Sequence, residues 1–158
     1  MDKLITVTRS SMPSFREYID EINSLWDNRW LSNRGEIHRK FEILLQERMQ
    51  VPYISLFANG HVALEVAIDA FNFPKGAEVI TTPFTHCSTT HSIVRNGLTP
   101  VFCDVNDNDY TIDVDQIEKH ITSKTVAIMA THVYGMMCDT DAIDIIARCA
   151  ISVRAEGQ

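Results

Sequence analysis

The sequence predicts an α/β fold in which a mainly parallel sheet carries helices on both of its faces. Short runs rich in Val and Ile alternate four times with segments whose apolar residues recur at helical spacing. Because a helix joins each run to the next, the strands should form right-handed βαβ crossovers and lie parallel. The predicted strands span residues 53–58, 78–82, 100–105 and 126–131, and the predicted helices span residues 61–71, 87–97, 114–121 and 140–149.

Two amphipathic helices are predicted ahead of this alternating region. The first covers residues 13–28, where Pro13 suits a first helical turn and apolar side chains recur at steps of three and four. The second covers residues 35–50, after the loop RWLSNRG. We therefore expect a helical amino-terminal segment at residues 1–50, βαβ units at 51–150 and a divergent tail at 149–158. No linker separates these parts, so one domain with an incomplete sheet is expected across residues 1–158.

The charge balance bears on the classes of partner. Fourteen basic and twenty-one acidic side chains give a formal net charge of −7, which argues against a nucleic-acid partner and against an anionic membrane surface. No apolar stretch approaches the roughly 20 residues that span a bilayer, and the start MDKLITVTRSS lacks the apolar region of a secretory signal. A cytoplasmic protein is expected.

Metal binding is not predicted. The four cysteines form no CxxC pair and the six histidines form no HExxH motif, so the cysteines are interpreted as idle or buried thiols. The acidic run DVNDNDYTIDVDQ lacks the central Gly and terminal Glu of a calcium-binding EF-hand loop and is interpreted as a solvated loop.

The first candidate site is the turn at Asn59, Gly60 and His61, where a predicted strand ends and a helix begins. Unpaired backbone N–H groups and the positive end of the helix dipole meet at such a turn, and both favour a phosphate. Gly60 would let the ligand approach the backbone, and His61 would add a side-chain donor. The alternative is a plain glycine turn followed by a helix.

Two further candidates follow other predicted strands. In TTPFTHCSTT, the ring of Phe84 or His86 can lie flat on a planar cofactor, unless the segment is an ordinary helix cap with a packed Phe84. In ATHVYG, His132 follows the last strand, although a lone histidine there can equally be a satisfied loop residue. Because ligands bind at the carboxyl ends of parallel strands, the three candidates should meet at one edge of the sheet.

The order of four segments resembles the DegT/StrS family of sugar aminotransferases, which use pyridoxal 5′-phosphate (PLP). These segments are WLSNRG, FANGHVALEVA, GAEVITTPFTHCSTTHSIVRNGLTPVFCDV and TSKTVAIMATHVYG, and the likeness runs from Pro13 to Arg148. The resemblance implies the amino-terminal part of the large domain of a fold-type-I aminotransferase. It also implies PLP as the cofactor, a nucleotide-linked keto-deoxysugar and an amino acid, commonly glutamate, as substrates, and a homodimer.

The resemblance assigns roles to individual positions. The family's Gly-Thr, which holds the cofactor phosphate, corresponds to Gly60 and His61, with His in place of Thr. The family's aromatic residue that stacks on the pyridine ring corresponds to His86, and its His-x-x-Gly beside the cofactor corresponds to His132 and Gly135.

The chain departs from the family after Arg148. The family's aspartate at the pyridine nitrogen and its Schiff-base lysine have no counterparts in CAISVRAEGQ, a change typical of a frameshift or a premature stop. Since the lysine is needed for transamination, the chain alone is expected to be inactive. Two alternatives remain open: a PLP-dependent sugar dehydratase of the same superfamily, in which histidine replaces the lysine, and a non-catalytic remnant that binds an intact partner.

Overall fold

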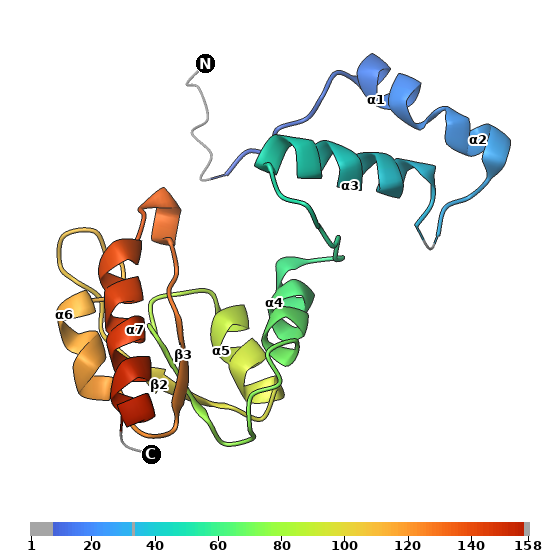
Figure 1. Cartoon of the computed structure of the whole chain (residues 1–158). Helices are drawn as coiled ribbons and strands as arrows, with labels where there is room; N and C mark the ends of the chain where they lie inside the picture. The colour runs from blue at the N-terminus through green and yellow to red at the C-terminus, as the bar shows by residue number, and fades with distance from the viewer. Residues whose placement is uncertain (1–7, 33, 157–158) are drawn as a thin grey trace, which may run out of the picture. The chain divides into compact units, whose positions relative to one another are not determined.

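A computed structural model describes residues 8–32 and 34–156 of the chain, without the side chains of residues 151–156. The chain divides into two compact units, Met1–Leu56 and Phe57–Gln158 (Figure 1). The division lies six residues after the end of the helical segment expected from the sequence.

The first unit consists of the helices α1 (Phe15–Ile22), α2 (Ser24–Asn28) and α3 (Glu36–Met49). Ser14 begins α1 with a capping box, in which its hydroxyl accepts from the Glu17 N–H and the Glu17 carboxylate accepts from the Ser14 N–H. Pro13 therefore precedes the cap, and its expected place in the first helical turn is wrong. The single helix predicted over residues 13–28 is also divided, because a tighter i→i+3 bond joins Trp26 N–H to Asn23 C=O.

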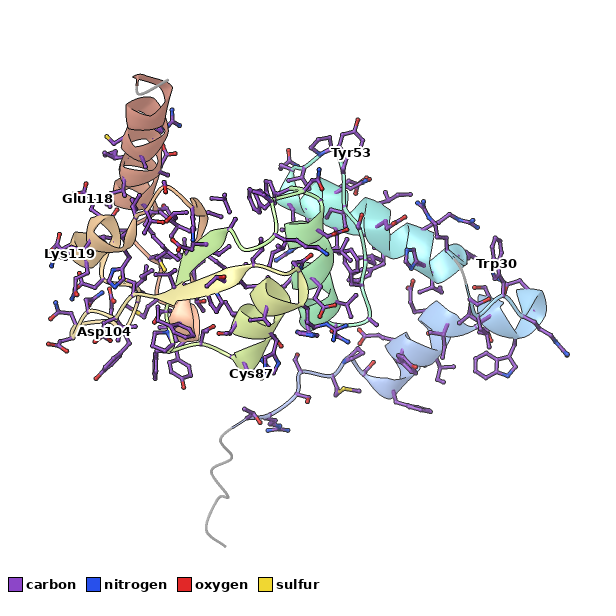
Figure 2. The ribbon with its side chains drawn as sticks, turned by 90° about the horizontal axis from the view of Figure 1, so that it is seen from below. Trp30, Tyr53, Cys87, Asp104, Glu118 and Lys119 are labelled. Atoms are coloured by element: carbon purple, nitrogen blue, oxygen red, sulfur yellow. The ribbon has the colours of Figure 1, made fainter. Side chains whose placement is uncertain are left out.

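The strand predicted at residues 53–58 is absent from the structure, and this prediction is wrong. A strand is stable only when a neighbour completes its backbone hydrogen bonds, and the described residues contain no strand that pairs with this segment. Its apolar run is also largely exposed, with Tyr53 projecting away from the ribbon (Figure 2).

The second unit contains a parallel sheet, as predicted. Its strands are β1 (Glu78–Thr81), β2 (Thr99–Phe102) and β3 (Thr125–Met129), in the order β2-β1-β3. Ile80 of β1 lies opposite Val101 of β2 and Ile128 of β3. The carboxyl ends of all three strands therefore point to one edge of the sheet.

Helices cover both faces of this sheet (Figure 1). Alternate residues of β1 point to opposite faces, so Val79 packs with Ile68 and Ile93, whereas Ile80 packs with Ile117. The first face carries α4 (Gly60–Asp69) and α5 (Cys87–Arg95). The second carries α6 (Val114–Ile117), the 3₁₀ turn η1 (Glu118–His120) and α7 (Thr140–Glu156). The predicted α/β class with helices on both faces is confirmed.

The loop after β3 contains a second 3₁₀ turn, η2 (Val133–Gly135). Among the helices that the structure describes, none combines the length and the apolar character needed to cross a membrane.

Candidate functional site

The amino-terminal end of α4 offers backbone donors to a ligand. Asn59 caps the helix, because its side-chain oxygen accepts from the Val62 N–H at 3.0 Å. The amides of Gly60 and His61 donate no hydrogen bond to any described residue. A Cβ added at Gly60 would meet no protein atom within 4 Å, so the space beside these amides is open. Two free donors at the positive end of a ten-residue helix suit a phosphate.

The side chain of His61 is directed along α4, toward the next turn. Its Nε2 lies 3.0 Å from the Glu65 carboxylate, which also contacts the Arg95 guanidinium on α5. His61 Nδ1 is enclosed and has no hydrogen-bond partner among the described atoms. In this arrangement the imidazole joins α4 to α5, and the backbone amide is the part of His61 that is available at the helix end.

These contacts also show how α4 and α5 are oriented. The ring of His61 lies 6.4 Å from that of His91, and one turn further along both helices Glu65 contacts Arg95. The two helices therefore run in the same direction. Because α5 follows the carboxyl end of β1, the amino-terminal ends of both helices lie at the edge where the sequence places the site.

His86 caps α5. Its Nδ1 accepts from the Ser88 N–H at 3.2 Å and lies 3.0 Å from the Ser88 hydroxyl. The ring is exposed, and Cys87 follows it at the first position of the helix (Figure 2). His86 therefore caps the helix and at the same time leaves its ring accessible to a ligand.

Threonine hydroxyls tie this loop to the loop after β3. The Thr85 hydroxyl lies 3.1 Å from that of Thr131 and 2.9 Å from that of Thr89. In the second loop, His132 Nδ1 accepts from the Cys138 N–H at 3.1 Å. Burial raises the pKa of the Cys138 thiol, which stays protonated and donates to the Thr131 carbonyl at 3.1 Å. Hydrogen bonds within and between the two loops therefore hold them in place.

An open cleft lies between these two loops. It is lined by Pro83, Phe84, Thr85, His86, Thr131, His132, Val133 and Tyr134. The structure thus brings the candidates His86 and His132 to the same cleft, whereas Gly60 and His61 are not among its lining residues. Sequence reasoning missed Thr131 and Tyr134. The sequence predicts Thr131 as the last residue of the strand at 126–131, but β3 ends at Met129, and the only sequence signal of Tyr134 is its position in the loop that follows.

No described lysine lines the cleft. The lysines outside it are Lys40, Lys75, Lys119 and Lys124, while Lys3 lies outside the described residues. Within the described residues, no group of three His, Cys, Asp or Glu side chains is arranged to hold a metal ion. Among the described residues, the start of α4 offers two free backbone amides to an anion, and the cleft between the loops has no lysine amine positioned to bond with a carbonyl carbon.

Comparison with known proteins assigns residues 15–151 to the DegT/DnrJ/EryC1/StrS aminotransferase family. The chain belongs to this family. The expected lineage is thereby confirmed over residues 15–151.

Individual relatives agree with this assignment. The chain is 42% identical over 146 residues to a dTDP-4-amino-4,6-dideoxy-D-glucose transaminase of Escherichia coli, covering 92% of this chain and 39% of that protein. It is 36% identical to a GDP-perosamine synthase of Escherichia coli O157:H7, covering 84% of this chain and 36% of that protein. The PLP form of Spr1654 from Streptococcus pneumoniae, a proposed sugar aminotransferase, superposes with a TM-score of 0.78 at 25% identity, covering 85% of this chain and 34% of that chain. The chain thus spans less than half the length of these relatives.

Proposed function

We propose that this chain forms the part of a PLP-dependent sugar aminotransferase that holds the cofactor phosphate and one face of its ring. The complete enzyme transfers an amino group from an amino acid, glutamate being the expected donor, to the keto group of a nucleotide-linked deoxysugar. The observation that carries the proposal is the pair of free amides at the start of α4, at the sheet edge where α5 also begins. Family resemblance supports a homodimer as the working form.

Each candidate residue has a defined part in this proposal. Gly60 and His61 donate their backbone N–H groups to the phosphate, and the positive end of α4 favours its charge. His86 presents its ring to the pyridine, held by its bond to Ser88. His132 orients the loop on the opposite side of the cleft through Cys138. When bound, PLP supplies a ring that withdraws electrons from the reacting carbon.

The positions of the lysines indicate which step of the reaction these residues do not perform. Proton transfer at the reacting carbon needs an amine close to the cofactor, and no described lysine lines the cleft. We therefore propose that residues 8–156 bind the cofactor without transamination of their own, and that another polypeptide segment provides the lysine.

A chimera tests the proposed activity. Residues 15–151 of this chain would replace the matching part of the E. coli transaminase, to which the chain is 42% identical. We expect the purified chimera to transfer the amino group of glutamate to the dTDP-linked keto sugar, with product measured by mass spectrometry. The matched control carries alanine in place of the Schiff-base lysine of the E. coli part, and it should be inactive.

Two results would count against the proposal. A folded chimera that retains no PLP would refute the cofactor role of these residues. A folded chimera that holds PLP but transfers no amino group to the sugar would refute the aminotransferase role of these residues.

A further inference from the structure

Glu65 is the centre of a polar network that joins α4 to its neighbour α5 (Figure 1). Its carboxylate lies 3.0 Å from His61 Nε2 in the first turn of α4 and also contacts the Arg95 guanidinium on α5. Its backbone carbonyl accepts from Asn96 Nδ2, at the end of α5, at 3.1 Å. We call His61, Glu65, Arg95 and Asn96 the Glu65 network.

The imidazole of His61 is committed to this network. Its Nε2 faces the Glu65 carboxylate, and its Nδ1 is enclosed by protein. The ring also lies edge-on to that of His91, with the centroids 6.4 Å apart. Neither ring nitrogen is therefore directed at the start of α4, where the His61 amide is available, so the side chain can affect an anion there only through the backbone.

The first turn of α4 is the part of the helix that needs such support. The first N–H groups of a helix have no intrahelical partner, and helix ends fray for this reason. The first helical hydrogen bond of α4 runs from the Ala63 N–H to the Asn59 carbonyl at 3.2 Å. His61 joins this turn to Glu65 one turn later, and α5 holds Glu65 in place. The side chains of His61 and Glu65 are only 33% and 24% exposed, so water and salt screen their contact less than a fully exposed one.

We infer that the Glu65 network holds the Gly60 and His61 amides in the orientation that binds phosphate, an inference that rests on the proposed function. His61, Glu65 and Arg95 are positioning residues in this scheme, because their side chains contact one another. A turn that is fixed before the ligand arrives loses less conformational freedom on binding, which raises the affinity. The effect of charge alone is the opposite for Glu65, since a carboxylate near the phosphate repels it.

Glu65→Leu separates position from charge. The variant removes a negative charge near the phosphate and frees the positive charge of Arg95, so charge alone predicts tighter binding of PLP. Positioning predicts the reverse. The preference of the full chain for PLP over pyridoxal, given by the ratio of their dissociation constants, should fall by about 2- to 5-fold, the effect of losing one partly exposed ion pair.

Variants of His61 test the same contact from its other side. His61→Leu should lower the preference for PLP by a similar factor, and His61→Gln should restore it, because a glutamine N–H can still donate to Glu65 one turn away. Asp144→Leu is the matched control for the loss of charge. It removes a carboxylate that pairs with Arg148 four residues on in α7, on the other face of the sheet, and should leave the preference unchanged.

Hydrogen exchange of the Ala63 amide, measured by NMR on the full chain without a ligand, tests the positioning itself. Exchange should be about 2- to 5-fold faster in His61→Leu and Glu65→Leu than in the unaltered chain and in Asp144→Leu. Circular dichroism checks that the variants are folded. If Glu65→Leu does not fold, the two His61 variants decide the question by the same measurements.

The inference is overturned if Glu65→Leu or His61→Leu keeps or increases the preference for PLP, or if exchange at Ala63 is unchanged in both. It is also overturned if His61→Gln behaves as His61→Leu does. These results would leave the proposed function standing as long as the unaltered chain prefers PLP to pyridoxal. If the unaltered chain shows no such preference, the proposed cofactor role is refuted, and this inference with it.

Discussion

Replacing Gly60 with proline should remove one of the two free amides at the start of α4 while leaving the helix in place. Proline is favoured at the first helical position, and the preceding residue must be extended, as Asn59 is with φ −163° and ψ 166°. A Cβ added at residue 60 would meet no protein atom within 4 Å. The Asn59 cap on Val62 does not involve the lost N–H and should remain.

The size of the effect follows from the lost hydrogen bond. A hydrogen bond to a charged group contributes about 1.5–3 kcal/mol, which corresponds to roughly 10- to 100-fold in affinity. The His61 amide and the helix dipole remain, so weakened rather than abolished binding of PLP is expected for Gly60→Pro. Gly60→Ala adds a Cβ at the same place but keeps the N–H, so it is the matched control and should bind PLP more tightly than Gly60→Pro does.

Equilibrium dialysis with PLP gives the two dissociation constants, and circular dichroism checks that both variants retain their helices. If Gly60→Pro binds PLP as tightly as Gly60→Ala does, the phosphate does not use this amide and the reasoning is refuted.

Three further predictions concern the second unit. Cys87 is exposed, whereas Cys103 is buried and burial raises the pKa of its thiol, so a thiol reagent should modify Cys87 before Cys103 in the native chain. Peptide mapping that finds equal rates at these two cysteines would contradict this. Hydrogen bonds from Thr111 lower the pKa of Asp109, so its stabilising effect is full above the ordinary carboxyl pKa and is lost as the pH falls through the lowered value. Asp109→Asn should flatten the dependence of unfolding free energy on pH in that acid range, and an unchanged profile would refute the assignment. Ile80→Ala should lower the free energy of unfolding, measured in urea, by about 2–5 kcal/mol, because Ile80 is fully buried between the sheet and α6. A smaller loss would contradict this packing, since it would mean that neighbouring side chains fill the space left by the removed atoms.

Much of the second unit could be predicted from the sequence because local pattern and tertiary structure agree there. Val79 and Ile80 are adjacent and both apolar, which is the pattern of a strand buried on both faces, and each packs under a different helix layer. The failure at residues 53–58 has the opposite origin. An apolar run indicates that a strand is possible, but the strand forms only where a neighbour supplies hydrogen bonds, and sequence pattern carries no information on that neighbour.

The candidate site shows the same limit. The prediction that His86 and His132 lie close together is confirmed, since both line one cleft. It followed from the parallel sheet, in which the loops after neighbouring strands meet at one edge. The direction of the His61 side chain could not be predicted, since it depends on Glu65 one turn away and on Arg95 of another helix. The position of Tyr134 at the cleft could not be predicted either, because its backbone is in the left-handed conformation, which tyrosine does not favour.

The most direct test of the account compares the binding of PLP and pyridoxal to the full chain of 158 residues, followed by borohydride reduction and mass spectrometry. If α4 holds the phosphate and no lysine lies in the cleft, PLP binds at least about tenfold more tightly than pyridoxal, and reduction attaches no cofactor to a specific lysine. Equal binding of the two compounds, or stoichiometric attachment of PLP to one lysine, would contradict the claim that this chain holds the cofactor phosphate without supplying the lysine.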